Sequence, residues 1–151
     1  MKNPERLSVT LHVLLHMAEQ PERAMTSEEM AACVGTHPVV IRRSFAGLRE
    51  AGVVQSVKGH GGGWRLAQPP DRLTLAQIQQ ALGERMVPLA AKQPEPQCLV
   101  VRAVIDVLDE AMREAEQVLD RRLASLTLAD LAAHTERLHG RRHMQGGRHG
   151  T

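Results

Sequence analysis

Aromatic residues are scarce in this 151-residue chain, which has one Phe, one Trp and no Tyr. A core must then be filled mainly by Leu, Val, Ile, Ala and Met, and this composition favours helices. The length is enough for one domain with its own core and an added dimerisation element, but not for two large domains.

The sequence also lacks a run of about 18 apolar residues, and its first residues, MKNPERLS, contain no apolar stretch like that of a signal peptide. We therefore expect a cytoplasmic protein that does not contact a membrane. Its two cysteines, Cys33 and Cys98, form no spaced set, and a structural disulfide is unusual in a reducing compartment.

Residue patterns typical of enzymes are missing as well: there is no Ser/Cys-His-Asp setting, no pair of carboxylates in a Gly-flanked loop and no cofactor motif. Residues 59–63, GHGGG, suggest a phosphate-binding loop, but they lack the Gly-Lys-Ser/Thr ending and join two expected strands. The histidines of the C-terminal tail, His139, His143 and His149, have a spacing that fits no compact metal site. We predict neither an enzyme nor a bound metal.

Residues 36–70 have the most informative pattern in the chain. His37-Pro38 predicts a helix start, because proline fits in the first turn and either Thr36 or His37 can cap the free N–H groups. Gly52 is expected to end this helix. The apolar face that should pack inward is formed by Ile41, Phe45 and Leu48.

Two short strands are expected after this helix, one over Val53 to Val57 and one around Trp64 and Leu66. The four glycines between them permit backbone angles and close approaches that side chains would block. Trp64 is interpreted as a contact between this hairpin and the body of the domain rather than as a base contact. A helix followed by a glycine-tipped hairpin is the order of a DNA-recognition helix and a wing.

Basic residues are concentrated in this region, although the net charge of the chain is only +2. Residues 36–72 contain six Lys or Arg residues against two acidic ones. Arginine can donate two hydrogen bonds to guanine, valine can contact a thymine methyl group, and Ser, Thr or His can hold a phosphate. Which arginine contacts a base stays open. The residues expected to contact DNA are Ser27, Thr36, His37, Pro38, Val39, Val40, Arg42, Arg43, Lys58, Gly59, His60, Gly61, Gly62 and Arg65.

Helical patterns also flank this region. A first helix begins near Leu7 and stops at Gln20-Pro21; a second opens at Thr26, with Cys33 as a small core residue. A helix from Thr74 to about Leu82 follows the hairpin. We therefore predict a winged-helix domain over residues 1–82, a loop over 83–97, dimerisation helices over 98–138 and a disordered basic tail over 139–151.

The pattern after Leu99 predicts one long amphipathic helix with a coiled-coil-like seam. A helix of roughly 25 residues spans about 37 Å, too long for so small a domain to cover. A second subunit is the natural cover. The residues expected at this dimer interface are Val101, Ile105, Leu108, Met112, Ala115, Leu119 and Leu123.

Two stretches resemble the Rrf2-type winged-helix regulators, relatives of IscR, NsrR and CymR, and in particular their YwnA-like branch. The first is AGVVQSVKGHGGGWRLAQPPDRLTLAQI, at the wing, and the second is TSEEMAACVGTHPVVIRR, at the helix-turn-helix. The resemblance extends from about Leu7 to Leu82, and more weakly through Leu131. It implies a mainly helical, homodimeric bacterial repressor that reads a palindromic operator and responds to a small signal. It also places Lys58 where a basic wing residue enters the minor groove, and Trp64 where an aromatic residue, usually Tyr, is common.

Iron-sulfur members of this family have three cysteines in the loop before the long helix, where this chain has Cys98 alone. No histidine lies between His60 and His134 to act as a substitute ligand. We therefore expect no iron-sulfur cluster and no other cofactor. Cys98 lies near the start of the long helix, where the helix dipole can lower a thiol pKa, so it is either a reactive sensor or an inert half-buried residue.

The sequence thus predicts a DNA-binding transcriptional regulator, more specifically a homodimeric repressor of a palindromic operator with Cys98 as a candidate thiol sensor. The alternative is a redox or ligand sensor whose helix-turn-helix serves mainly in protein interaction. The excess of Arg and Lys on the expected DNA-reading segment favours the first hypothesis.

Overall fold

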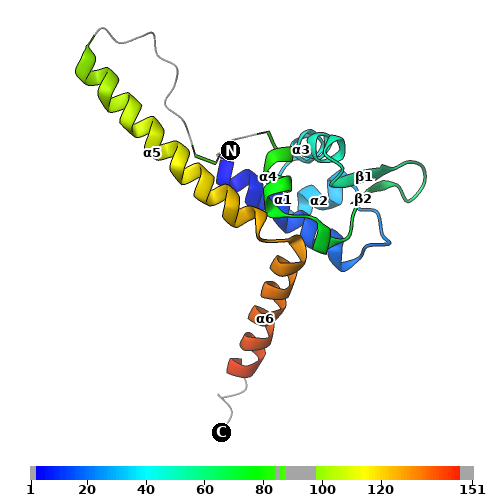
Figure 1. The fold of residues 1–151 in the computed structure, drawn as a ribbon. Coiled ribbons are helices and arrows are strands. Elements are labelled where there is room, and N and C mark those ends of the chain that lie inside the picture. Colours follow the sequence, from blue (N-terminus) through cyan, green and yellow to red (C-terminus); the bar gives the residue numbers. More distant parts are fainter. Residues whose placement is uncertain (1–2, 84–85, 88–97, 147–151) are drawn as a thin grey trace.

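The computed structural model describes residues 3–83, 86–87 and 98–146, and within them the fold is mainly helical with one two-stranded antiparallel sheet (Figure 1). The elements in chain order are α1 (Asn3–Glu19), α2 (Ser27–Val34), α3 (Pro38–Glu50), β1 (Val54–Val57), β2 (Gly63–Leu66), the 3-10 turn η1 (Pro70–Arg72), α4 (Leu75–Ala81), α5 (Leu99–Ala124) and α6 (Leu128–Gly146). The predicted fold class is confirmed.

A single core lies among α1, α2, α3 and α4, and aliphatic side chains and methionines form most of it. Phe45 is the one aromatic side chain among its fully buried members, which include Leu14, Met17, Met30 and Leu48. The composition therefore led to the correct expectation, because a chain so poor in aromatics has to fill its interior with Leu, Val, Ile and Met.

The helix starts follow the capping residues seen in the sequence. Thr26 accepts a hydrogen bond from the backbone N–H of Glu29, whose carboxylate accepts one from the N–H of Thr26. Thr74 and Gln77 make the same reciprocal pair at α4. At α3 the cap is His37, one of the two alternatives that the sequence left open. Such pairs satisfy N–H groups that have no partner within the helix.

The expectation that Cys33 is a core residue is wrong. The buried residues of α2 are Ser27, Met30 and Ala31, and Val34 continues their face, whereas the thiol of Cys33 is exposed. Ser27, Met30, Ala31 and Val34 follow the i, i+3, i+4, i+7 spacing of one helix face, and at about 100° per residue Cys33 lies off that face. In the short α2, that face includes Val34 and leaves Cys33 at its edge.

Strands β1 and β2 form the predicted hairpin, with Val54 paired to Leu66 and Val57 paired to Gly63. The hairpin is also tied to the domain, because Met25 and Trp64 exchange two backbone hydrogen bonds of 2.9 and 2.8 Å. Gly63 has φ 147°, and a Cβ atom there would lie 2.4 Å from the carbonyl oxygen of Met25. Only glycine allows the strand to approach the chain before α2 this closely.

Helices α5 and α6 meet at a junction that is bonded to the segment before α4. The N–H of Leu75 donates to the oxygen of Leu126 over 2.9 Å, and the N–H of Leu128 donates to the oxygen of Leu73 over 2.8 Å. Leu128 is fully buried. This junction fixes the start of α6 on the core.

Two of the predicted segments, the loop over 83–97 and the tail over 139–151, are described only in part. Helix α6 continues to Gly146, so the expectation of disorder over residues 139–146 is wrong; a single glycine, Gly140, does not interrupt the helix. The rest of that tail, residues 147–151, and most of the expected loop over 83–97 lie outside the described residues. None of the described helices has the length and apolar character needed to cross a membrane.

Candidate nucleic-acid interface

Helices α2 and α3 pack against each other through a tight turn at Gly35. Gly35 adopts left-handed backbone angles, φ 67° and ψ 39°, and its N–H donates to the oxygen of Ala31. This closes α2 and redirects the chain into α3, whose first residue is Pro38. A glycine at the end of one helix and a proline at the start of the next are the expected turn chemistry of a helix-turn-helix.

The outer face of α3 carries apolar and basic side chains. Val39 and Val40 are 45% and 37% exposed, although apolar residues of this size usually pack inward. Arg43 is exposed too, and at about 100° per residue it lies nearly opposite the buried Leu48 and Ile41. Valine can contact a thymine methyl group, and arginine can donate two hydrogen bonds to a guanine edge.

Arg42, by contrast, is held by a neighbour on α2. Its guanidinium donates to the carboxylate of Glu28 over 2.6 Å, and both side chains are largely exposed. The sequence interpretation did not include Glu28; its position in the first turn of α2 was visible, but its distance to Arg42 was not. Arg42 and Arg43, adjacent in sequence, therefore differ in their freedom to contact DNA.

Ser27 is not available in the way that the sequence suggested. Its side chain is buried, and its hydroxyl oxygen accepts a hydrogen bond from Trp64 Nε1 over 3.2 Å. The ring of Trp64 also meets Phe45 edge to face, with ring centroids 5.5 Å apart. The interpretation of Trp64 as a contact between wing and body is confirmed, and this arrangement argues against the phosphate contact predicted for the Ser27 hydroxyl.

The wing tip is a tight turn in which the N–H of Gly62 donates to the oxygen of Gly59 over 3.0 Å. Lys58 and His60 are exposed beside it. Arg65 is half-buried on β2 and alternates with Trp64 and Leu66, which face the core, so it lies on the other face of the hairpin. The tip thus presents cationic and imidazole groups on a narrow backbone.

The structure places most of the predicted DNA-contacting residues in one part of the molecule. Figure 1 shows α3 and the wing on one side of the domain, with α5 and α6 extending from the other side. His37, Gly59 and Gly61 are exposed, and Thr36, Pro38 and Gly62 are half-buried. The part that the sequence assigned to DNA is therefore physically separate from the part that it assigned to dimerisation.

The face of α5 that should contact a second subunit is largely uncovered, and no residue of this helix is buried. Val101, Leu108, Met112 and Ala115 are exposed as expected, and Ile105 and Leu119 are half-buried. Leu123 instead packs against the core of its own domain. The exposed apolar residues that the sequence interpretation did not include are Leu99, Val100, Val104, Val107 and Val118.

Cys98 is the exposed residue that precedes α5. Its sulfur makes no capping hydrogen bond of ordinary geometry, but the backbone N–H groups of Val101 and then Val100 lower the pKa of the thiol. This lowering of the pKa agrees with the general effect of a helix N-terminus, which stabilises a thiolate. Of the two alternatives from the sequence, the half-buried inert cysteine does not match the exposure of Cys98.

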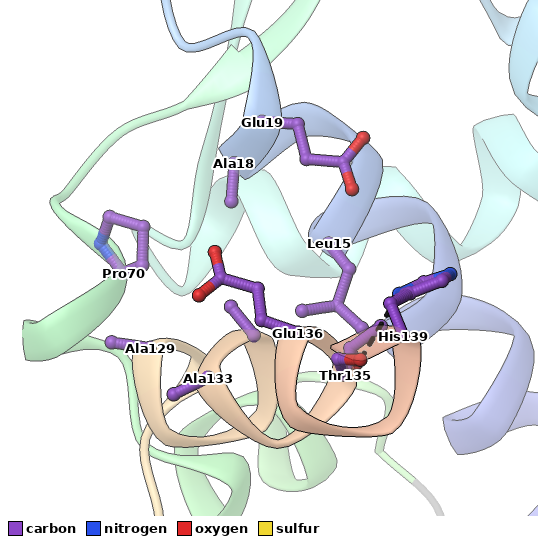
Figure 2. Close-up of a pocket in the computed structure, with 10 residues that line it drawn as sticks. Leu15, Ala18, Glu19, Pro70, Ala129, Ala133, Thr135, Glu136 and His139 are labelled. Carbon is purple, nitrogen blue, oxygen red and sulfur yellow. Dashed lines mark hydrogen bonds between the residues drawn. The ribbon is translucent and has the colours of Figure 1, made fainter. Parts of the chain in front are cut away.

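A cavity of about 340 Å³ lies between α1 and α6, away from the proposed DNA-contacting residues (Figure 2). Figure 2 shows Leu15 and Ala18 of α1 facing Glu136 and His139 of α6, with Pro70 at one end. The lining is a mixture of small apolar side chains and carboxylates. The cavity has no connection to the chemistry predicted from the sequence.

A tight helix-turn-helix whose second helix has an exposed outer face, with a glycine-tipped hairpin beside it, defines a winged helix-turn-helix DNA-binding protein. The family model of Rrf2, described as an iron-dependent transcriptional regulator, matches residues 4–134. The chain belongs to this family of transcriptional regulators.

Known proteins support the same assignment. The chain is 30% identical to the "Putative HTH-type transcriptional regulator YwnA" of Bacillus subtilis strain 168. The aligned 130 residues cover 85% of this chain and 96% of YwnA. A crystal structure of "a putative DNA binding protein" is 28% identical with a TM-score of 0.64, over 83% of this chain and 97% of the other. A "putative transcriptional regulator" from Lactobacillus plantarum shares the fold, with a TM-score of 0.74 at 20% identity over 95% of this chain and 98% of the other.

The family description names iron, and an iron-sulfur cluster would need a set of ligands on this chain. Such clusters are held by three or four protein thiolates. This chain has two cysteines, Cys33 on α2 and Cys98 at the start of α5. The thiols present therefore do not fit an iron-sulfur cluster.

Proposed function

We propose that this regulator is a homodimeric repressor that binds a palindromic operator, with α3 in the major groove and the wing at the adjacent minor groove. The observation that carries the proposal is the outer face of α3, where Val39, Val40 and Arg43 are exposed opposite the buried face. Apolar side chains kept in solvent beside an arginine suit a surface that is covered on binding DNA.

Within this surface, Arg43 is the proposed base-reading arginine. It projects from the outward face of α3, whereas Arg42 is already paired with Glu28. Arg42 must exchange this carboxylate for a phosphate or a base, so its net contribution is smaller. Lys58 and His60 at the wing supply sequence-independent contacts to the phosphates of the minor groove.

The dimer is proposed through the uncovered face of α5. Val104, Val107 and Leu108 are 52%, 66% and 55% exposed, and together with Leu99 and Val100 they line a shallow apolar groove. A continuous apolar stripe on a helix of 26 residues is typical of a helix that packs against a partner helix. Two subunits joined in this way provide the two readers that a palindrome requires.

Cys98 is the proposed point at which a thiol-reactive signal acts. It is exposed, the pKa of its thiol is lowered by the first N–H groups of α5, and it immediately precedes the proposed dimerisation helix. Modification of its sulfur adds bulk at the start of that helix, which sets the spacing of the two readers. The competing hypothesis is a sensor that uses its helix-turn-helix for protein contacts. The basic outer face of α3 favours DNA over a protein partner.

The test is fluorescence anisotropy with duplexes that tile the DNA flanking this gene, followed by transcription in vitro from the duplex that binds. We expect Arg43→Ala to weaken binding by about 1 to 3 kcal/mol and to relax preference at one base pair. Arg43→Lys keeps the charge but loses bidentate geometry, so it should recover non-specific binding only. Lys58→Ala should weaken binding to every duplex and reduce the salt slope by about one.

Arg113, exposed on α5, offers a matched control, and Arg113→Ala should bind DNA like the parent. Glu28→Gln releases Arg42 and should bind at least as tightly as the parent. Equal binding by the parent and the Arg43 and Lys58 variants would show that another surface reads DNA. Increased transcription on adding the protein would show an activator rather than a repressor.

A further inference from the structure

Two histidines and one cysteine meet on the surface between α1 and α2. His12 and His16 lie four residues apart on α1, and Cys33 lies on α2. One ring nitrogen of each histidine and the sulfur of Cys33 all lie within 4.8 Å of one another. Imidazole nitrogen and thiolate sulfur are the ligands that Zn²⁺ and similar transition-metal ions prefer in proteins.

The spacing of the two imidazoles is close to that of a bound pair. The two Nε2 atoms are 3.1 Å apart, and tetrahedral Zn²⁺ with Zn–N bonds of about 2.05 Å separates two nitrogens by about 3.3 Å. A sulfur at about 2.3 Å from the ion would lie roughly 3.5 Å from each nitrogen. Closing the cluster therefore requires a side-chain movement of roughly 1 Å, which rotation of exposed His12 and Cys33 provides.

The carboxylate of Glu19 lies next to His16, one of the three candidate ligands. Oε2 of Glu19 is 3.5 Å from Nδ1 of His16, on the side of the ring away from the His12 contact. A carboxylate that accepts a hydrogen bond from Nδ1–H fixes the tautomer in which Nε2 is free to bind a metal. Glu19 is therefore placed to orient His16 without being a ligand itself.

We propose that His12, His16 and Cys33 form a binding site for a single borderline-soft divalent transition-metal ion such as Zn²⁺, with water in the fourth position. The two imidazoles bind as neutral groups, and the thiol of Cys33 loses its proton to solvent when the sulfur binds. The ion joins α1 to α2, the first helix of the helix-turn-helix. The site is distinct from the cysteines that hold iron-sulfur clusters elsewhere in the family and does not use Cys98.

The first experiment is a titration of the Cys98→Ser protein with Co²⁺, because Cys33 is then the only thiol in the chain. We expect a thiolate-to-cobalt charge-transfer band that saturates at one equivalent and is removed by Zn²⁺. In the same background, His12→Gln and His16→Gln should each weaken Co²⁺ binding at least tenfold. His60→Gln, which changes an exposed histidine on the wing, is the matched control and should bind Co²⁺ like the Cys98→Ser protein.

The second experiment uses the unmodified protein and needs no variant. One equivalent of Zn²⁺ should slow the alkylation of Cys33 by iodoacetamide at least tenfold, whereas Cys98 in the same sample should be alkylated at an unchanged rate. Absence of the charge-transfer band, unchanged Co²⁺ binding in both histidine variants, or alkylation of Cys33 that does not respond to Zn²⁺ would each overturn the proposal. Far-UV circular dichroism confirms that the variants keep their helices.

Discussion

The hydrogen bond between Trp64 and Ser27 anchors the wing to the first helix of the DNA-binding motif, and its contribution can be measured with a double-mutant cycle. The indole Nε1 donates to a buried hydroxyl over 3.2 Å. A net contribution of about 1 kcal/mol is typical for such a bond. Trp64→Phe removes the donor but keeps a ring that can meet Phe45 edge to face.

The expected free-energy changes follow from the burial of each group. Trp64→Phe loses the bond and roughly 40 Å² of ring surface, most of it buried, so it should lower the free energy of unfolding by about 1.5 to 2 kcal/mol. Ser27→Ala loses the same bond and should cost about 1 kcal/mol, because the half-buried indole can still reach water. The double variant should cost less than the sum, by a coupling energy of about 1 kcal/mol.

Urea unfolding followed by far-UV circular dichroism, at one fixed protein concentration, gives the four free energies. Ser8→Ala, which changes an exposed serine of α1, provides the control pair with Trp64 and should show coupling below about 0.5 kcal/mol. DNA affinity should fall with Trp64→Phe, because the wing loses an anchor. Additive costs in the Ser27 cycle would refute the proposed role of this hydrogen bond.

Two further predictions concern α5. Leu108→Glu introduces a carboxylate into the proposed dimer interface, and we expect the dissociation constant to rise more than a hundredfold, at a cost of at least about 3 kcal/mol, with Arg113→Glu on the other side of the helix as the control. Sedimentation equilibrium measures this, and a monomeric parent at micromolar concentration would exclude the dimer. The lowered pKa of Cys98 means that its reactive thiolate persists to lower pH in the folded protein, so the pH midpoint of its alkylation should lie below that in urea. Equal midpoints, read by mass spectrometry, would remove the physical basis for Cys98 as a sensor.

The elements that the sequence predicted well are those governed by neighbours in the chain. The caps at Thr26 and Thr74, the helix start at His37-Pro38 and the glycine-tipped hairpin all depend on contacts within a few residues. Hydrophobic periodicity likewise located α3 and α5, because a helix repeats its faces about every 3.6 residues. The helix-turn-helix and its wing could therefore be located from the amino-acid sequence alone.

The errors occurred where a local pattern leaves two outcomes open. Cys33 and Val34 are adjacent, and only the packing of α2 against its neighbours decided which of them turns inward. Leu123 fits the periodic seam of α5, but the fold of the α5–α6 junction brings it onto its own core. In α6, Gly140 and the basic residues that follow it suggested disorder, yet the helix continues to Gly146.

The sequence by itself determined the order of elements, the basic reading segment and the apolar stripe of α5, because these follow from local propensity and periodicity. Tertiary structure decided which side chains meet: Glu28 with Arg42, Ser27 with Trp64, and Cys33 with the two histidines of α1. The spacing of His12 and His16 is visible in the chain, but nothing in the sequence indicates that a cysteine on another helix completes the cluster. Contacts between separate elements depend on how helices pack against each other, and that geometry is fixed by the whole core rather than by any one segment.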